Sequence, residues 1–415
     1  MRFGLIYWIL PFVILISILT LFFFAQRFWF RQAFSLLERL PSRTWQKIGR
    51  AAVTVIFASF VVLLADRIFL HLLPSQGPAS LFIQVTQLWL FASSLAFLAM
   101  KVVYGVEWLW SGATRASSSS PVDGERRSFF KYAAYGAGAI PLLAGIYGYT
   151  AERFDFTVHS VEVPIPNLPA NLDGFRIVQL SDIHIGDFMP AHEVRRAVEI
   201  ANGLNAHLAV LTGDLLTSKR DPLYVCVAEL SRLNAPLGIW GCNGNHEIYA
   251  DAEDEAERLY QRFGMTLLRQ RSAQVEWNGA RLNLIGVDYQ RQPRSFPASS
   301  RPMLEGVEGL VRNDMPNVLL SHNPNSFHRA AELGIELSLA GHTHGGQVKI
   351  EIIDHSFSPA SFVTDFIAGL YRLPASGREG AGFAHLYVNR GLGTIGVPAR
   401  IGVDPEITLL TLRRA

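Results

Sequence analysis

FRIVQLSDIHIGD, residues 175–187, joins an apolar run to a polar segment that carries Asp182 and His184. The run FRIVQL is short and almost uninterrupted, which is typical of a buried strand. On an extended segment residues i and i+2 point the same way, so the two side chains can converge on one centre. This stretch therefore predicts a core strand that ends in a cluster of polar ligands.

The same pattern returns along the rest of the C-terminal part. The runs LAVL, LGIWG, VLLS and LSLAG each end in polar residues, and LNLIGV is a further buried run. Helical stretches at Ala191 to Asn202 and Asp251 to Phe263 lie between them. Alternating strands and helices are typical of an α/β fold, in which sites assemble at the carboxyl ends of strands. We expect one α/β domain over residues 151–415.

The residues after these strands form a ligand set of imidazoles, carboxylates and one amide: Asp182, His184, Asp214, Asn245, His322, His342 and His344. Such a set, without cysteine, suits Mn, Fe or Zn better than Mg or Ca. It exceeds the need of one ion, and two divalent metal ions that share a bridging aspartate commonly hydrolyse phosphate esters. For GHTHGG taken alone, at residues 341–346, a hydrogen-bonded turn is an equally good interpretation.

The N-terminal part has a different character. Of the 415 residues, 49% are hydrophobic and only 17% charged, with a mean hydropathy of +0.21, which is too apolar for a soluble domain. Four stretches approach the ~20 residues that cross a bilayer. They are Phe3 to Phe24, Ala51 to Leu73, Ala79 to Met100 and Phe129 to Tyr149. We expect a multi-pass, four-span helical membrane bundle over residues 1–150.

Basic residues predict the orientation of these spans, because short loops rich in Lys and Arg stay in the cytoplasm. The loop between the first two spans carries Arg27, Arg31, Arg39, Arg43, Lys47 and Arg50 against Glu38. With four spans, residues after Tyr149 would lie outside the cytoplasm. The second span is weakened by Asp66, Arg67 and His71.

A polar linker, ASSSSPVDGE at residues 116–125, precedes Arg126-Arg127-Ser128-Phe129-Phe130-Lys131. This motif resembles a twin-arginine export signal, so the twin-arginine export machinery is one expected partner. An ordinary positive-inside anchor explains the motif equally well. Both interpretations send the C-terminal domain to the same side.

Other features carry less information. The net charge of +2 does not favour a nucleic-acid partner. Cys226 and Cys242 are expected to be buried small hydrophobes, although one disulfide stays open. GLGTIG at residues 391–396 fits a dinucleotide-binding pattern, but Pro398 follows and no helix opens, so a tight loop is the better interpretation. Glu247 is either a partner that orients a ligand or an exposed helix-start acid. His192, His207, His328, His355 and His385 are expected at the surface or in the core.

The blocks DxH, GD, GNHE, H and GHTH, in this order, resemble the calcineurin-like metallophosphoesterase family. The tail from LYVNRGLGT to PEITLLTL resembles that of its membrane-tethered bacterial branch, in which such a loop packs near the metal site. The resemblance implies a two-sheet β-sandwich flanked by helices. It also implies roles: Asp182, His184 and His344 hold the first metal, Asp214 bridges both, Asn245, His322 and His342 complete the second, and His246 is the acid that protonates the leaving oxygen. Ser321 departs from the family, which often has glycine there.

The expected function is therefore a membrane-anchored phosphohydrolase of the bacterial inner membrane whose catalytic domain faces the periplasm or the exterior. A metal-bridging hydroxide would attack a phosphate ester or pyrophosphate of a lipid or envelope substrate. Two alternatives stay open: a cytoplasm-facing UDP-2,3-diacylglucosamine pyrophosphatase of lipid A biosynthesis, and a non-enzymatic membrane sensor or scaffold. The segments Gln290 to Pro302 and Pro374 to Gly382 are candidate substrate loops, and the oligomeric state is unknown.

Overall fold

The computed structural model describes residues 2–66, 78–115, 124–290, 303–348, 350–352, 355–357, 364–377 and 382–415. The chain divides into two compact units, Met1–Tyr149 and Thr150–Ala415. The boundary lies where hydropathy changes in the sequence. Three predicted segments lie partly outside the described residues: positions 291–302 of the expected substrate loop from Gln290 to Pro302, positions 378–381 of that from Pro374 to Gly382, and positions 116–123 of the polar linker.

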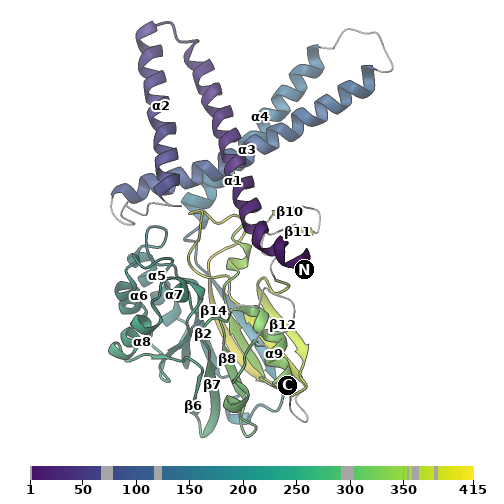
Figure 1. Ribbon diagram of the computed structural model, residues 1–415. Helices are drawn as coiled ribbons and strands as arrows, with labels where there is room; N and C mark the ends of the chain where they lie inside the picture. The colour runs from purple at the N-terminus through teal and green to yellow at the C-terminus, as the bar shows by residue number, and fades with distance from the viewer. Residues whose placement is uncertain are drawn as a thin grey trace. The chain divides into compact units, whose positions relative to one another are not determined.

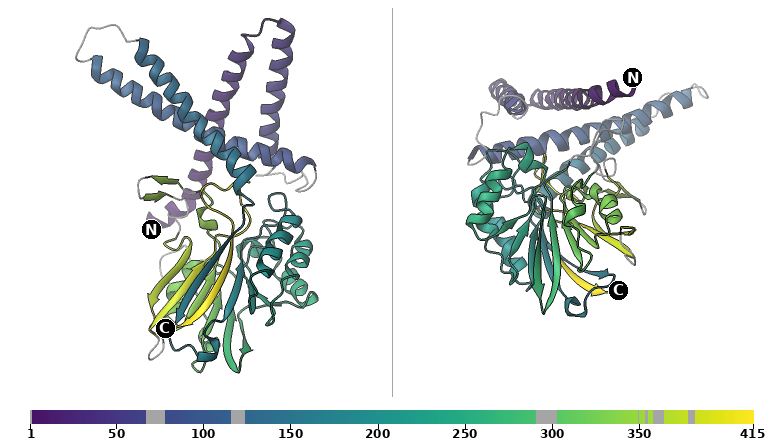
Figure 2. Two further views of the ribbon diagram at one scale, coloured as in Figure 1. Left: turned by 180° about the vertical axis from the view of Figure 1, so that it is seen from behind. Right: turned by 60° about the horizontal axis from the view of Figure 1, so that its bottom comes forward.

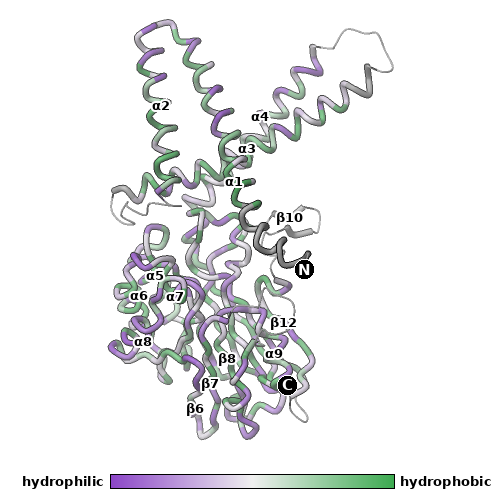
Figure 3. Tube along the Cα trace, in the orientation of Figure 1, coloured by the Kyte–Doolittle hydropathy of each residue, from purple (hydrophilic) through white to green (hydrophobic). Residues whose placement is uncertain are grey.

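The N-terminal unit consists of long helices (Figure 1): α1 (Arg2–Leu37), α2 (Arg43–Ala65), α3 (Pro78–Arg115) and α4 (Gly124–Tyr147), which a π-helical turn, η2 (Gly148–Glu152), extends. Apolar residues run along most of each helix (Figure 3). Polar side chains join α1 to α3: Gln26 Nε2 donates to Ser93 Oγ over 3.0 Å and Trp89 Nε1 to Gln26 Oε1 over 2.9 Å. Such hydrogen bonds between helices are typical of membrane bundles.

The expected count of four spans is corrected to three among the described residues. Helical segments long and apolar enough to cross a membrane are Arg43–Ala65, Ser80–Ser111 and Gly124–Glu152. The expected first span, Phe3 to Phe24, falls on α1, where most side chains before Leu15 lie outside the described set. The second ends at Ala65 as a helix, and Arg67 and His71 lie outside the described residues. The twin-arginine motif lies in the first turns of α4.

The C-terminal unit is built on two six-stranded sheets. The first has the order β1-β14-β2-β3-β4-β5, with bounds Thr157–Ile165, Glu406–Arg414, Arg176–Leu180, Leu208–Leu211, Ile239–Gly241 and Thr266–Leu267. The second has the order β12-β13-β9-β8-β7-β6, with bounds Gly369–Pro374, Phe383–Val388, Leu337–Ala340, Asn317–Leu320, Ala280–Gly286 and Arg271–Trp277. A separate hairpin pairs β10 (Ile350–Ile352) with β11 (His355–Phe357). The buried runs predicted from the sequence are β2, β3, β4, β7, β8 and β9, and the two-sheet architecture is confirmed.

Helices cover the outer faces of the two sheets (Figures 1 and 2). On one side lie α5 (Ala191–Asn202), α6 (Leu223–Leu230), α7 (Asn245–Tyr249) and α8 (Glu253–Arg262), and on the other α9 (Phe327–Glu332). Short 3-10 turns are η3 (Ala170–Leu172), η4 (Glu308–Leu310), η5 (Pro324–Ser326) and η6 (His344–Gly346). Both predicted helices form, since α5 has the expected bounds and α8 is slightly shorter than Asp251 to Phe263.

Alternation along the strands explains this layering. In β2, Val178 and Leu180 pack in a core with α5, α6 and α8, whereas Ile177 packs in the core that the two sheets share. In β8, Leu319 packs with α9, and Val318 faces the shared core. Successive side chains of a strand point to opposite faces, so a strand covered on both sides is apolar at most positions. This is why these strands read as nearly continuous apolar runs.

Candidate metal centre

The strand ends bring the predicted ligands together. Asp182 and His184 follow β2, Asp214 follows β3, and His246 opens the helix after β4. His322 follows β8, while His342 and His344 follow β9 in the same sheet. Three overlapping groups have ligand atoms within 4.8 Å of one another: Asp182, His184 and His344; His184, Asp214 and His246; Asp214, His322 and His342. The two sheets thus contribute to one centre.

The backbone at these positions is strained, which the sequence interpretation missed. Asp182 and His184 have φ of 50° and 48°, and Asp214 has 55°. His342 and His344 have φ of 75° and 51°. Non-glycine residues rarely adopt this left-handed region, and such outliers gather at functional sites. Asp182 and His184 therefore converge through tight turns, and the expectation of an extended segment was wrong.

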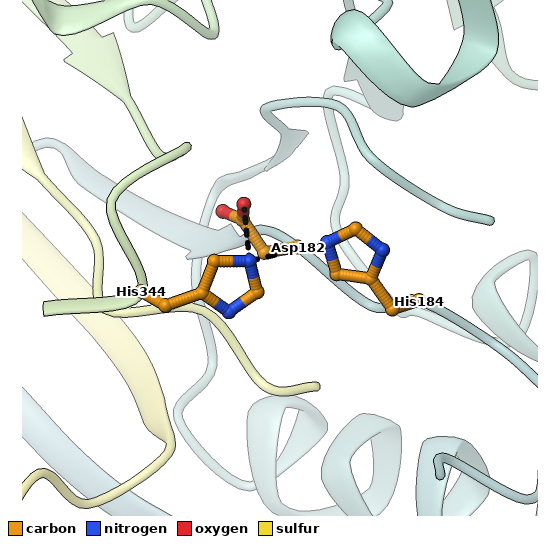
Figure 4. A group of neighbouring side chains, drawn as sticks. All are labelled: Asp182, His184 and His344. Carbon is orange, nitrogen blue, oxygen red and sulfur yellow. Dashed lines mark hydrogen bonds and ion pairs between the residues drawn. The ribbon is translucent and has the colours of Figure 1, made fainter. Parts of the chain in front are cut away.

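Two imidazoles of the first group face each other (Figure 4). His184 Nε2 and His344 Nε2 are 3.2 Å apart, and His344 Nε2 lies 3.4 Å from Asp182 Oδ1. Their other ring nitrogens have partners, because His184 Nδ1 lies 3.0 Å from Thr217 Oγ1 and His344 Nδ1 lies 3.3 Å from the carbonyl of Gly393. A carbonyl can only accept, so it assigns the proton of His344 to Nδ1 and leaves the Nε2 lone pair toward the centre.

His322 is oriented in the same way. Its Nδ1 donates to the carbonyl of Thr212 over 2.6 Å, and its Nε2 lies 3.1 Å from Asp214 Oδ2. Although burial lowers the pKa of His322, the carboxylates of Asp214 and Asp182 outweigh it and raise that pKa. Asp214 in turn has a lowered pKa, because the nearby histidines outweigh the effect of its burial. The carboxylates around His322 thus favour a positive charge at this position, which a metal ion can supply.

Burial holds the pKa of His184, His342 and His344 below the usual value of a histidine. Burial lowers the pKa of His184 and of His344 to about 3, and that of His342 to about 4. Neutral imidazole is the form that binds metal ions. Asn245 Oδ1 is buried and accepts no hydrogen bond from the described residues. A buried acceptor without a partner is costly, so this oxygen and the facing imidazoles fit a bound cation.

His246 lies at the open side of the centre. Its backbone N–H donates to Asp214 Oδ1 over 2.8 Å, and its Nδ1 lies 2.8 Å from the carbonyl of Thr217. The ring centroids of His246 and His184 are 4.8 Å apart. Unlike His184 and His322, His246 is only half-buried, so its ring can reach a bound substrate.

Glu247 is a buried partner of the centre and not an exposed helix-start acid. Only 1% of it is exposed, and its carboxylate accepts from the backbone N–H groups of Gly244, Asp214 and Leu215 over 2.6, 2.9 and 2.7 Å. Burial and the charge of Asp214 raise its pKa. Glu247 therefore joins the turn after β3 to the turn after β4.

Sequence reasoning missed Thr217 and Arg400, which contact the ligands or the loops beside them. No motif marks them, because Thr217 acts partly through its carbonyl and Arg400 donates its hydrogen bonds to backbone carbonyls among the described residues. The described side chains of the histidines that fitted no motif are not among the three ligand groups. His192 is exposed, His207 stacks on Trp277 at 4.1 Å between ring centroids, and His385 is buried in β13. His328 packs against Phe366, and the side chain of His355 lies outside the described set.

The cysteines have the expected surroundings. Cys226 and Cys242 are both buried and unpaired, and burial raises the pKa of each thiol. The disulfide that the sequence left open is absent between these two described residues.

Comparison with known proteins agrees with this geometry. Residues 175–346 match the model of the calcineurin-like phosphoesterase family. A zebrafish (Danio rerio) transmembrane protein with metallophosphoesterase domain is 31% identical over 288 residues, which cover 66% of this chain and 62% of that protein. The uncharacterised metallophosphoesterase YkuE of Bacillus subtilis is 28% identical over 69% of this chain and 97% of its own length. The phosphodiesterase YaeI of Escherichia coli is 26% identical over 58% and 83%.

The matched region lies wholly within the C-terminal unit and contains every predicted metal ligand. The relatives are animal as well as bacterial, so they do not assign the chain to the bacterial branch that its tail resembles. The fold implies divalent metal ions, and the clustered side chains can supply their ligands. The apolar helices and the transmembrane relative together suggest membrane association. Over residues 175–346, the C-terminal unit of this chain is similar to calcineurin-like phosphoesterases.

Proposed function

We propose that this chain is a membrane-anchored phosphoesterase that hydrolyses a phosphate ester or pyrophosphate with two divalent metal ions. The observation that carries the proposal is the set of ring nitrogens and carboxylates that face one another within 4.8 Å. Buried imidazoles whose outer nitrogens are held by oxygen partners are prepared for metal binding. Mixed nitrogen and oxygen ligands favour Mn, Fe or Zn.

The two ions would share Asp214. Asp182, His184 and His344 form the group for one ion, and His322 and His342 form a group with Asp214, which the unpaired oxygen of Asn245 would complete for the other ion. When bound, the cations would supply Lewis acidity that lowers the pKa of the attacking water and balances charge on the phosphoryl oxygens.

The protein's own part is to orient ligands and to move a proton. The carbonyl of Thr217 fixes Nδ1 of His246, which leaves Nε2 as the atom that protonates the leaving oxygen. Glu247 holds the backbone of Asp214 and so keeps the bridging carboxylate in place. A non-enzymatic scaffold is expected to lose such groups, whereas every predicted ligand position is filled here.

The substrate that we infer is a lipid or envelope phosphate near the bilayer. The helical spans and the transmembrane relative support the anchor, and the name of the E. coli relative supports a diester. We further propose that the domain faces the periplasm or exterior of a bacterial inner membrane. The basic segment from Arg27 to Arg50 supports this orientation.

The first test is hydrolysis of bis-p-nitrophenyl phosphate and p-nitrophenyl phosphate by the full chain in detergent with Mn²⁺. We expect Asp214→Asn to lower the rate by more than about 100-fold, because even the outer partners of metal ligands contribute about 10–100-fold. A chelator should abolish the reaction and Mn²⁺ should restore it.

His192→Ala is the matched control, since that imidazole is exposed on α5, and its rate should equal that of the native chain. Full activity in Asp214→Asn, or no hydrolysis of either ester with Mn²⁺, Fe²⁺ or Zn²⁺, would contradict the proposal.

A further inference from the structure

Arg400 is a buried charge next to the metal centre that the proposed mechanism does not use. None of it is exposed, and it is the largest of the fully buried side chains. Burial lowers its pKa to about 10, so the guanidinium stays charged at neutral pH. Its Nε and Nη1 atoms are buried without a hydrogen-bond partner among the described residues, so the contacts of Nη2 indicate what it does.

Those contacts converge on one short loop. Arg400 Nη2 donates to the carbonyls of Arg390, Gly391 and Gly393 over 3.0, 2.9 and 2.6 Å. The two hydrogen atoms of Nη2 are shared by three carbonyls, which would otherwise repel one another. The guanidinium therefore fixes the direction of the Gly393 carbonyl.

The same loop lies directly on the strand end that carries Asp182. The N–H of Leu392 donates to the carbonyl of Ser181 over 3.0 Å, and that of Gly393 donates to the carbonyl of Asp182 over 2.7 Å. A Cβ at position 391 would lie 2.6 Å from Asp182 Cβ, and one at 393 would lie 2.3 Å from the carbonyl oxygen of Ile183. Gly391 and Gly393 thus permit a close approach to residues 182 and 183, which accounts for two glycines of a motif that resembled a dinucleotide-binding pattern.

The Gly393 carbonyl also accepts from His344 Nδ1, over 3.3 Å. One oxygen therefore connects Arg400 with a ligand of the first metal group. An acceptor at Nδ1 keeps the proton there and turns the Nε2 lone pair toward Asp182 and His184. If the carbonyl rotates away, His344 loses this orientation.

We propose that Arg400 is a positioning residue for the first metal, acting through the Gly393 carbonyl on His344. The inference rests on the proposed function, since it assumes that His344 binds a cation. It is specific to one of the two ions, because His322 of the second group is oriented by the carbonyl of Thr212.

The test is a Mn²⁺ titration of the full chain in detergent, followed by calorimetry and by electron paramagnetic resonance of the bound ions. We expect Arg400→Met to weaken one of two Mn²⁺ sites by about 10–100-fold, the usual effect of losing a partner behind a metal ligand. The other site should keep its affinity, and the signal of coupled Mn²⁺ pairs should fade at concentrations that fill both sites of the native chain.

Arg413→Met is the control, because Arg413 pairs with Glu162 at the surface and leaves the loop untouched. Arg400→Lys keeps the charge with a shorter reach and should weaken the same site less. If Arg400→Met does not fold, the lysine variant carries the test alone.

Unchanged affinity at both sites, or equal weakening of both, would overturn the role of Arg400. Failure of the native chain to bind two ions of any of Mn²⁺, Fe²⁺ and Zn²⁺ would overturn the proposed function itself. A native chain that binds two ions without hydrolysing either ester would refute only the reaction, so the failures are distinguishable.

Discussion

At the scale of single residues, the metal ligands could be predicted from the sequence, but the residues that orient them could not. Asp182, His184 and Asp214 were found because carboxylates and imidazoles after buried strands are rare outside sites. Thr217 and Arg400 were missed because they act largely on or through backbone carbonyls, which no side-chain pattern reveals. The positive φ of the ligands was missed for a similar reason, since tertiary contacts impose it.

Glu247 offers a test at this scale. Replacing it by glutamine turns one accepting oxygen into an N–H donor that faces backbone N–H groups of Gly244, Asp214 or Leu215. We expect a loss of about 1–3 kcal/mol in the free energy of unfolding, as for other buried groups left without a partner. Denaturant unfolding of the full chain measures it, and a loss below about 0.5 kcal/mol, the size of a neutral surface change, would contradict this account.

At the scale of elements, the strands that are apolar at most positions could be located from the sequence, because both of their faces are covered. β1 was not predicted, since its exposed and buried positions alternate and its pairing partner β14 is remote in sequence. Among the described residues, three helices rather than the predicted four are long and apolar enough to cross a membrane. Pairing between distant segments is a property that local patterns do not encode.

A pair between two helices gives a prediction about pH. Arg195 of α5 donates to Glu229 of α6 over 3.0 and 2.5 Å, and this bonding lowers the pKa of Glu229 below its usual value of 4.5. A carboxyl group whose pKa is lowered by folding stabilises the fold above pH 4.5 and loses that contribution as the pH falls through its folded pKa. Glu229→Gln should therefore lower the thermal midpoint at pH 7 and have a smaller effect near pH 3.

Thermal unfolding at the two pH values measures this difference. Glu255→Gln, at an exposed position of α8, is the control and should leave the midpoint unchanged at both. An effect of Glu229→Gln that is equal at pH 7 and near pH 3 would exclude the ion pair as its cause.

At the scale of the whole molecule, the division at Tyr149 follows from composition, because apolar helices and an α/β unit need different surroundings. The side of the membrane on which the second unit lies is a separate question. It depends on the number of spans and on the basic segment from Arg27 to Arg50.

Reporter fusions after Ala415 answer it in bacterial cells. Alkaline phosphatase is active only outside the cytoplasm, and we expect its fusion to be active. Green fluorescent protein does not fluoresce after export through the general secretory route, and we expect its fusion to be dark. The opposite pattern would reverse the proposed orientation.

Replacing Arg126 and Arg127 by lysine then separates the two interpretations of the motif, because a twin-arginine signal fails with two lysines whereas a positive-inside anchor keeps its charge.

The position of β14 has a consequence for how the chain is made. β14 follows every other strand in sequence, yet it lies between β1 and β2 and pairs Thr157 with Glu406 and Val178 with Leu409. The first sheet therefore cannot join β1 to β2 while residues 406–414 are still in the ribosome. Contacts so distant in sequence form slowly, so a nascent chain waits with an open edge until synthesis reaches β14.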